Sequence, residues 1–191
     1  MKLALFGGTF NPIHRGHIEI AKRVHEELGY DKIVFMPNNK SPLKNPSTGS
    51  SSLDRIAMIN LAIGAYPYMS LSEYESRKKG DSFTIDTIQW LHLVSNFARI
   101  PYQFGLIIGE DQANVFEQWK DFKEILELSD IIIANRGEKE ITFKYPYTSL
   151  KNDFINISST EIRRDVLGRS DDLDLSVLNY ICDNRLYGVT K

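Results

Sequence analysis

The stretch that decides the fold of this chain reads Leu5-Phe6-Gly7-Gly8-Thr9-Phe10-Asn11-Pro12-Ile13-His14-Arg15-Gly16-His17. An apolar run over residues 3–6 predicts a short buried strand that stops at the two glycines. From Ile18 onward, apolar residues recur at helical spacing, so a helix is expected after the turn. This order of strand, glycine turn and helix brings backbone N–H groups and the positive end of a helix dipole to one point. It therefore favours phosphate binding.

Two histidines three residues apart, His14 and His17, distinguish this turn from an ordinary phosphate-binding loop. Two imidazole rings aimed at a bound anion can donate hydrogen bonds to the oxygens of a pentacovalent phosphorus centre. The same spacing also suits a structural zinc ion, but no cysteine or carboxylate cluster stands nearby to complete such a site. We therefore predict an anion site and no metal ligands from the protein.

The composition is that of an ordinary globular protein, with 42% hydrophobic and 25% charged residues in 191. A net charge of −2 argues against nucleic acid as a partner. No apolar run approaches the length of a membrane span, and the first one, which breaks at Gly7, is no signal peptide. A single cysteine, Cys182, excludes an intrachain disulfide and fits a reducing compartment. We predict a cytoplasmic protein.

Strand-like and helix-like segments alternate along the chain, which predicts an α/β fold. We expect a Rossmann-like, doubly wound parallel sheet with helices on both faces, as a single domain over residues 1–191. After the first strand, the further strands are expected at residues 33–36, 69–71, 104–108 and 131–134. Helices are expected from about residues 18, 54, 82, 158 and 176. The C-terminal helical portion, about 158–191, should pack on the rest of the domain.

A second anion site is predicted near the C-terminal end. Ser158 and Glu161 have the spacing of a capping box, so a helix should begin there. The serine hydroxyls, the free N–H groups and Arg163 one turn later would together bind an anion. A capping box alone more often marks only the start of a helix. Two helix N-termini that can each bind phosphate, however, favour a triphosphate ligand.

Three other features of the chain each leave two interpretations open. The loop over residues 38–52 is either a plain surface loop or a ligand-binding loop, because it leaves the carboxyl end of a strand. Asp111, just after the most apolar strand, suits a ribose hydroxyl or the cap of the next helix. Phe116 and Trp119 lie at helical spacing, which is more typical of core packing than of ligand stacking.

Residues 7–17 resemble the signature of the nucleotidylyltransferase superfamily, whose pattern is Gly-x-Phe-x-Pro-x-His-x-Gly-His. Over nearly the whole chain, the motifs resemble those of bacterial nicotinate mononucleotide adenylyltransferase. The further matches are Met36-Pro37-Asn38-Asn39, Ser72-x-x-Glu75, Gly80-Asp81-Ser82-Phe83-Thr84, Gly109-Glu110-Asp111, Trp119, Ile157-Ser158-Ser159-Thr160-Glu161-Ile162-Arg163, Tyr180-Ile181 and Leu186-Tyr187. The resemblance implies transfer of AMP from ATP to nicotinate mononucleotide, giving deamido-NAD and pyrophosphate. It also implies Mg²⁺ on the ATP phosphates, held mainly by phosphate oxygens and water.

The resemblance also assigns roles to individual residues. The residues implied to bind ATP are Gly7, Gly8, Thr9, Phe10, His14, His17, Gly109, Asp111, Ser158, Ser159 and Arg163. Three of these, His14, His17 and Arg163, are the implied catalytic residues. The residues implied to bind the acceptor nucleotide are Asn38, Asn39, Lys40, Lys44, Phe83, Thr84, Trp119 and Arg136. No covalent enzyme intermediate is needed, because the acceptor phosphate attacks in line while the protein positions and neutralises.

The chain departs from the family pattern at several positions. Leu43 stands where a loop histidine is usual, Phe83 replaces a tyrosine, and no proline follows Arg136. Residues 171–174 are also more acidic than usual. Three alternatives stay open: a sister transferase acting on nicotinamide mononucleotide or phosphopantetheine, one transferring CMP, and a non-catalytic nucleotide-binding module. The sequence does not predict the oligomeric state.

Overall fold

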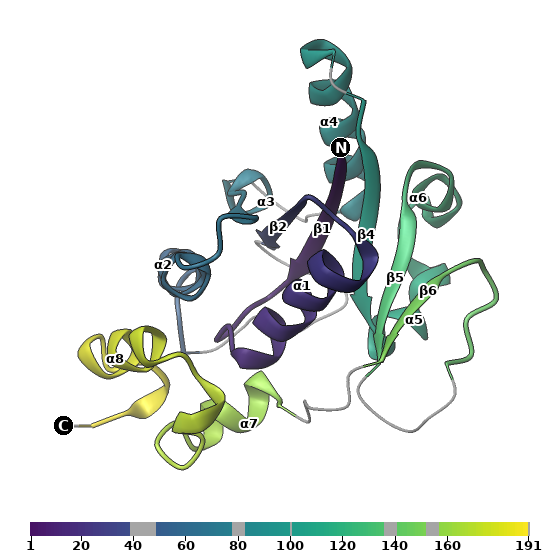
Figure 1. Ribbon diagram of the computed structural model, residues 1–191. Helices are drawn as coiled ribbons and strands as arrows, with labels where there is room; N and C mark the ends of the chain where they lie inside the picture. The colour runs from purple at the N-terminus through teal and green to yellow at the C-terminus, as the bar shows by residue number, and fades with distance from the viewer. Residues whose placement is uncertain (39–48, 78–82, 100, 136–140, 152–156, 191) are drawn as a thin grey trace.

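The computed structural model describes residues 1–38, 49–77, 83–99, 101–135, 141–151 and 157–190. Its centre is a parallel sheet of six strands in the order β3-β2-β1-β4-β5-β6 (Figure 1). The strands are β1 (Lys2–Gly8), β2 (Lys32–Pro37), β3 (Met69–Leu71), β4 (Gln103–Gly109), β5 (Asp130–Asn135) and β6 (Thr148–Lys151). The predicted α/β class and parallel sheet are confirmed.

Eight α-helices accompany the sheet in the part of the chain that the structure describes. They are α1 (Arg15–Leu28), α2 (Ser52–Ile63), α3 (Tyr74–Arg77), α4 (Thr84–Ala98), α5 (Glu110–Ala113), α6 (Phe122–Leu128), α7 (Ser159–Arg164) and α8 (Leu175–Asp183). Short 3₁₀ turns follow at Phe116–Gln118, Ser170–Asp172 and Leu186–Gly188. None of these helices is long and apolar enough to cross a lipid bilayer.

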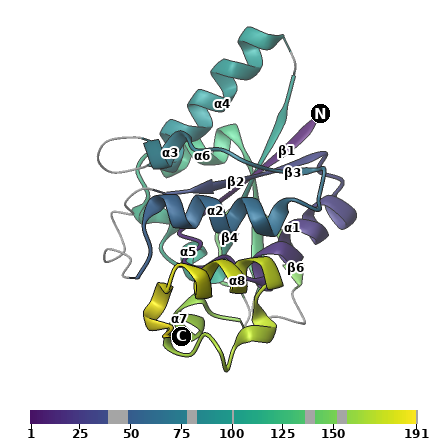
Figure 2. The same ribbon diagram turned by 90° about the vertical axis from the view of Figure 1, so that its left-hand side faces the viewer.

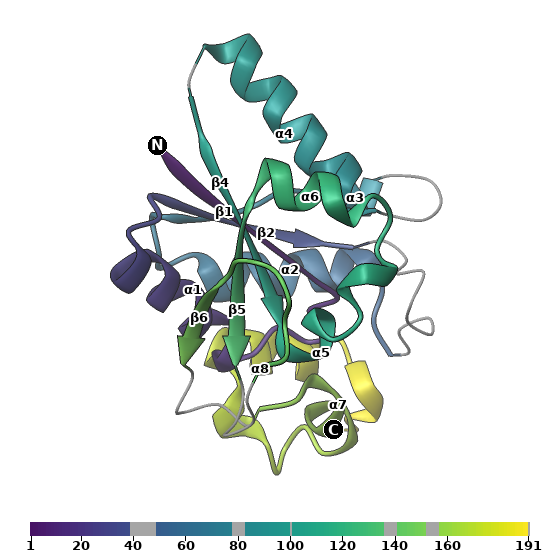
Figure 3. The ribbon, with the colours of Figure 1, turned by 90° about the vertical axis from the view of Figure 1, so that its right-hand side faces the viewer.

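Helices cover both faces of the sheet, as predicted. One core packs residues of α1, α2 and α8 against one face, with Phe6 and Phe35 at its centre. The other packs residues of α4, α5 and α6 against the opposite face, around Leu5 and Met36. Neighbouring residues of a strand enter different cores because side chains alternate across a sheet. Figure 3 shows α4, α5 and α6 together on one side.

The strand order places a switch point at β1. The chain leaves β1 toward β2 on one side and later returns to pair β4 along the other side. The connections therefore diverge at the carboxyl ends of β1 and β4, where they open a crevice between them. Gly8 ends β1 opposite Pro37, and Gly109 ends β4. The glycine turn of the first motif thus sits at the place where such sheets bind ligands.

Two details differ from the sequence-based expectations. Strand β6 was not predicted, because it is a short edge strand. Thr148 and Ser149 are exposed, and Leu150 is the one buried residue among the side chains of β6 that the structure describes. The helical spacing of Ile85, Ile88, Leu91 and Val94 predicts that all four face the core along α4, yet 45% of Val94 is exposed. The helix projects beyond the sheet at its C-terminal end (Figure 1), so the described residues cover that turn only in part.

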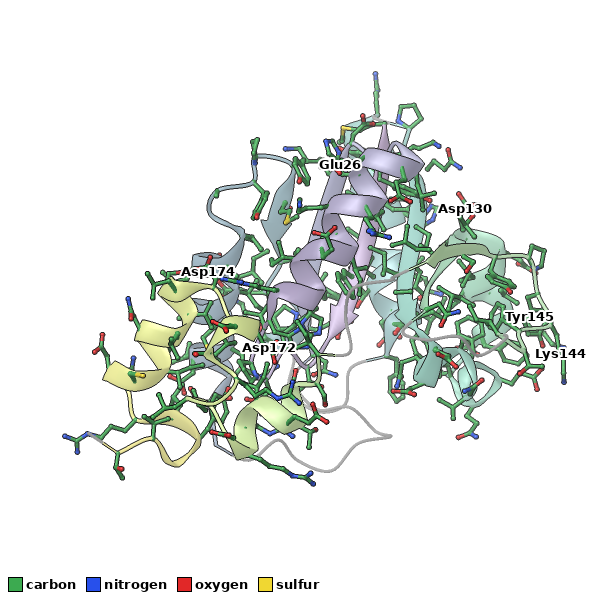
Figure 4. The ribbon with its side chains drawn as sticks, turned by 60° about the horizontal axis from the view of Figure 1, so that its bottom comes forward. Glu26, Asp130, Lys144, Tyr145, Asp172 and Asp174 are labelled. Carbon is green, nitrogen blue, oxygen red and sulfur yellow. The ribbon has the colours of Figure 1, made fainter. Side chains whose placement is uncertain are left out.

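The C-terminal portion lies at the carboxyl ends of the strands, below α1 and α2 in Figure 2. Val177 and Ile181 of α8 are buried in the same core as α1 and α2. Figure 4 shows Asp172 and Asp174 on this portion, on the side away from Lys144 and Tyr145. Its position brings α7 next to the glycine turn.

Candidate active site

The turn between β1 and α1 is held in shape by an aromatic ring. Phe10 has a left-handed backbone conformation, with φ of 48°, and is 2% exposed. Its ring packs against Phe6 and Phe35 at centroid distances of 5.5 Å each. A Cβ on Gly8 would meet that ring at 2.9 Å, so only glycine fits beneath it. Phe10 can therefore reach a ligand only through its backbone.

His14 and His17 lie against each other at the start of α1. Their ring centroids are 3.7 Å apart, and the backbone N–H of His14 donates to Nδ1 of His17 at 3.3 Å. His14 is the N-cap residue of α1, and its backbone carbonyl accepts from the N–H of His17 at 2.9 Å. A neutral His17 that accepts at Nδ1 carries its proton on Nε2, so Nε2–H is a donor at the helix mouth.

Helix α7 docks on the carbonyl side of the same turn. Ser159 Oγ donates to the carbonyl of Pro12 at 3.0 Å. Arg163 Nη1 donates to the carbonyl of Asn11 at 2.6 Å, and its Nη2 donates to Thr160 Oγ1 at 3.1 Å. The N-termini of α1 and α7 are thus brought together, with the guanidinium of Arg163 beside the glycine turn.

The predicted helix start at Ser158 is correct, but its capping box is not formed. Ser158 is the N-cap of α7, yet its side chain makes no capping hydrogen bond. The carboxylate of Glu161 accepts from Arg169 at 2.6 Å instead, and this pair draws it away from the backbone. The Ser158 hydroxyl is consequently not committed to capping.

A cavity of about 170 Å³ opens at the switch point, and we call it the switch-point cavity. It is lined by residues from both predicted sets: Gly7, Gly8, Thr9, Asn38, Phe83, Thr84, Gly109 and Trp119. A Cβ built on Gly7 or Gly109 would meet no atom within 4 Å, so both glycines leave space open there. The cavity runs from the glycine turn to the first turn of α4.

Trp119 closes one side of this cavity. Its indole Nε1 is buried and has no hydrogen-bond partner among the described residues. Phe83 is the N-cap of α4 and makes no side-chain cap there, and Phe83 and Thr84 both line the cavity, so α4 begins at the cavity wall. Lys120 Nζ lies 4.9 Å from the Phe83 ring centroid and 3.3 Å from Asp86. These groups together offer donors and a flat ring.

A buried carboxylate also lines the cavity. Glu75 on α3 is 7% exposed and accepts from the hydroxyl of Thr87 at 2.6 Å. Thr87 is fully buried on α4, so this bond ties α3 to the first turns of α4. Glu75 belongs to the quoted motif, but the sequence assigned it no role. Gln112, Gln118 and Lys120 line the cavity as well and were not predicted.

Some predicted residues lie elsewhere. Asp111 is exposed on α5 and is not among the described residues that line the cavity. His14 borders a second hollow, between α1, α2 and α8, together with Glu19, Lys22 and Asp174. Four predicted acceptor-binding residues fall outside the described part of the chain: Asn39, Lys40, Lys44 and Arg136.

Two residues to which the sequence assigned no role, Arg55 and Tyr187, donate hydrogen bonds to the glycine turn. Arg55 on α2 is 3% exposed, and its guanidinium donates to the carbonyls of Thr9 and Asn38 at 2.8 Å each. Burial lowers the pKa of Arg55. Tyr187, near the C-terminal end, donates to Asn11 Oδ1 at 2.6 Å. The signal for Arg55 was a lone arginine within the apolar pattern of its helix.

Comparison with known proteins agrees with this geometry. The family model described as cytidylyltransferase-like matches residues 5–165. Relatives named "probable nicotinate-nucleotide adenylyltransferase" include one from Treponema pallidum (strain Nichols), 37% identical over 85% of this chain and 86% of the relative. Another, from Methylacidiphilum infernorum, is 34% identical over 97% of this chain and 92% of the relative. The similarity thus extends over nearly the whole length.

Solved structures share the fold. The Plasmodium falciparum nicotinic acid mononucleotide adenylyltransferase complexed with NaAD superposes with a TM-score of 0.82, at 18% identity, over 99% of this chain and 98% of the other. Its complex with APC gives a TM-score of 0.80 over the same shares of both chains. At this identity the likeness supports the fold alone. With the family model and the curated relatives, it leads to one assignment: this chain belongs to the cytidylyltransferase-like family, among the nicotinate-nucleotide adenylyltransferases.

Proposed function

We propose that the protein transfers AMP from ATP to nicotinate mononucleotide, forming deamido-NAD and pyrophosphate. One observation carries the proposal: a single cavity extends from the glycine turn to Thr84 and Trp119. An adenylyl transfer needs both nucleotides in one space, with the acceptor phosphate beside the α-phosphate of ATP. The names of the relatives support the same reaction.

In this proposal the ATP phosphates lie at the glycine turn. The backbone N–H groups of Gly8–Phe10 and the positive end of the α1 dipole face the α-phosphate. His17 donates from Nε2 to its oxygens, where negative charge builds up in the transition state. Arg163 and Ser159 bind the leaving pyrophosphate in this proposal, and their hydrogen bonds to the carbonyls of the turn support that assignment.

The acceptor half of the cavity suits a carboxylate on a flat ring. The first turn of α4 offers backbone N–H groups and a positive dipole end, and Trp119 offers a face for stacking. The buried Nε1 of Trp119 is a further donor without a protein partner among the described residues. A carboxylate accepts from all of these donors, whereas an amide turns its own NH₂ toward one of them.

The reaction requires no covalent intermediate with the protein. An oxygen of the acceptor phosphate attacks the α-phosphorus of ATP in line, and the bond from that phosphorus to the α–β bridging oxygen breaks. The bonding electrons leave with pyrophosphate. The protein positions both reactants and neutralises the charge on the equatorial oxygens.

We propose that Mg²⁺ enters with ATP. Phosphate oxygens and water supply the oxygen ligands that this ion prefers, and no three His, Cys, Asp or Glu side chains gather as a metal site in the described residues. When bound, the ion neutralises charge on the phosphates.

The C-terminal portion belongs, in this proposal, to the same single domain as the sheet. Ser159, Arg163 and Tyr187 support this assignment, because each donates a hydrogen bond to the glycine turn. The free thiol of Cys182 supports a cytoplasmic setting.

A panel of acceptors tests the proposal. The protein is incubated with ATP, Mg²⁺ and either nicotinate mononucleotide, nicotinamide mononucleotide or phosphopantetheine, and pyrophosphate release is measured. We expect kcat/KM for nicotinate mononucleotide to exceed that for the amide by roughly 10- to 100-fold, because a buried unpaired donor costs about 1–3 kcal/mol. Equal values, or a preference for the amide, would reject the acceptor assignment. Release with phosphopantetheine alone would favour a sister transferase, and no release with any acceptor would favour a binding module.

A further inference from the structure

Arg55 is a buried cation placed between two loops of the site. Its Nη1 donates to the carbonyl of Thr9, in the glycine turn after β1, at 2.8 Å. Its Nη2 donates to the carbonyl of Asn38, directly after β2, also at 2.8 Å. The N–H of Asn38 in turn donates to the carbonyl of Gly8 at 3.0 Å. Both loops border the switch-point cavity, so one side chain fixes their separation.

The charge of Arg55 has no carboxylate to balance it among the described residues. The side chain is 3% exposed, and its Nε makes no hydrogen bond to any described group. Its remaining contact is a long one, 3.5 Å from Nη2 to Ser52 Oγ. A buried charge without a partner ion is costly, and its field is weakly screened because little water surrounds it. An anion bound at the turn would offset that cost.

The bond to Thr9 also acts through the peptide group. A guanidinium that binds a carbonyl polarises the peptide, and the N–H at its other end becomes a stronger donor. The carbonyl of Thr9 shares its peptide with the N–H of Phe10. Phe10 itself is fixed by its buried ring, so this N–H keeps one direction.

We propose that Arg55 is a positioning residue for the triphosphate: it locks the loops after β1 and β2 together and supplies a buried positive charge that the nucleotide neutralises. The role rests on the proposed function only in taking ATP as the anion. Arg55 acts through the turn and through its field, since its side chain is buried and its guanidinium bonds to two loop carbonyls. It is distinct from Arg163, which donates to the carbonyl of Asn11 instead.

The experiment compares ligands of different charge on matched variants. Arg55→Met removes the charge and both hydrogen bonds but keeps a long side chain, and Arg55→Lys keeps the charge with a single ammonium group. Ile59→Val, one turn further along α2 and fully buried, removes one methylene group away from the loops and serves as the stability control. Affinities for ATP with Mg²⁺ and for adenosine are measured by calorimetry without an acceptor, and melting temperatures are recorded for each variant.

We expect Arg55→Met to weaken ATP binding by about 10- to 100-fold and adenosine binding by less than about threefold. Arg55→Lys should bind ATP more tightly than Arg55→Met, and Ile59→Val should bind both ligands like the wild type. A folded Arg55→Met that binds ATP normally, or that loses both ligands equally, would overturn the proposal. So would a lysine variant that binds no better than the methionine one.

If Arg55→Met does not fold, the affinities of Arg55→Lys for ATP and adenosine test the proposal by themselves. A loss of about 3- to 10-fold for ATP with unchanged adenosine binding would support the proposal, because the charge stays while the fork between two carbonyls is lost. Equal losses, or none, would overturn it. Because no acceptor is present, these results are independent of the acceptor panel, and a failure of either test is recognised without the other.

Discussion

The hydroxyl of Tyr187 donates to Oδ1 of Asn11 at 2.6 Å, across 176 positions of the chain. Asn11 is 2% exposed in the middle of the glycine turn, and Ser50 Oγ donates to the same oxygen at 2.5 Å. The carbonyl of Asn11 accepts from Arg163. The first and last segments of the protein therefore meet in one buried polar network behind the turn.

This contact predicts a loss of stability at alkaline pH. Burial raises the pKa of Tyr187 from 10.0 to about 12. Below pH 10 the phenol is neutral in both the folded and the unfolded state. As the pH rises from 10 toward 12, the unfolded state loses its proton first, so the contribution of Tyr187 to stability disappears. Tyr187→Phe should remove this pH-dependent contribution. The decrease in the free energy of unfolding between pH 8 and 11 should therefore be smaller than in the wild type by about 1 kcal/mol.

Urea denaturation at both pH values measures the effect. Tyr30→Phe is the matched control, because burial raises the pKa of Tyr30 to about 12 as well, while its hydroxyl lies against Gly105 of β4. Both variants should reduce the alkaline loss, but only Tyr187→Phe should raise the KM for ATP. Identical alkaline curves for wild type and Tyr187→Phe would contradict the burial of this phenol.

The two glycines at the end of β1 should respond differently to alanine. A Cβ on Gly8 would meet the buried Phe10 ring at 2.9 Å, whereas one on Gly7 would meet nothing within 4 Å. Gly8→Ala should therefore cost about 1–3 kcal/mol of stability through overpacking. Gly7→Ala should keep the melting temperature but raise the KM for ATP, since its methyl group enters the switch-point cavity. Thermal melting and initial rates distinguish the two, and the reverse order would refute the described turn.

His17 should matter for turnover more than for binding. We expect His17→Ala to lower kcat by ~100- to 1,000-fold, as for loss of one transition-state donor, with the affinity for ATP changed only a few-fold. The control is His25→Ala, near the other end of α1, where the ring bonds to the Tyr30 carbonyl and stacks on Tyr68. Single-turnover rates with nicotinate mononucleotide measure the difference. Near-normal turnover of His17→Ala would remove this histidine from the mechanism.

Arg163 should act on ATP rather than on the acceptor. Arg163→Ala should raise the KM for ATP by roughly 10- to 100-fold, because charge-assisted hydrogen bonds contribute about 1.5–3 kcal/mol. Arg163→Lys should recover only part of the affinity for ATP. Its single ammonium group lacks the planar guanidinium that can bond to the Asn11 carbonyl and to a phosphate at the same time. Separate KM values for the two substrates check this prediction. A rise confined to the acceptor would place α7 in the other half of the site.

The sequence by itself determined the sheet and the location of the site. Apolar runs predicted five of the six strands, and three of these runs end at a glycine or a proline. The turn at residues 7–17 pointed to phosphate because glycine spacing and the two histidines are local features. These features can be recognised without tertiary information, because apolar runs and turn residues are patterns of neighbouring residues in the sequence. The edge strand β6 escaped because only Leu150 among its described side chains is buried.

Only the tertiary structure decided what stands behind the turn. Arg55, Tyr187 and Ser159 come from three distant segments, and each bonds to a different group of the turn. A single arginine within a helix, or a tyrosine near the C-terminal end, carries no pattern that names its partner. Their roles arise because the parallel sheet and its crossovers bring the carboxyl ends of the strands, α2 and the C-terminal portion to one edge, where long-range packing fixes each donor.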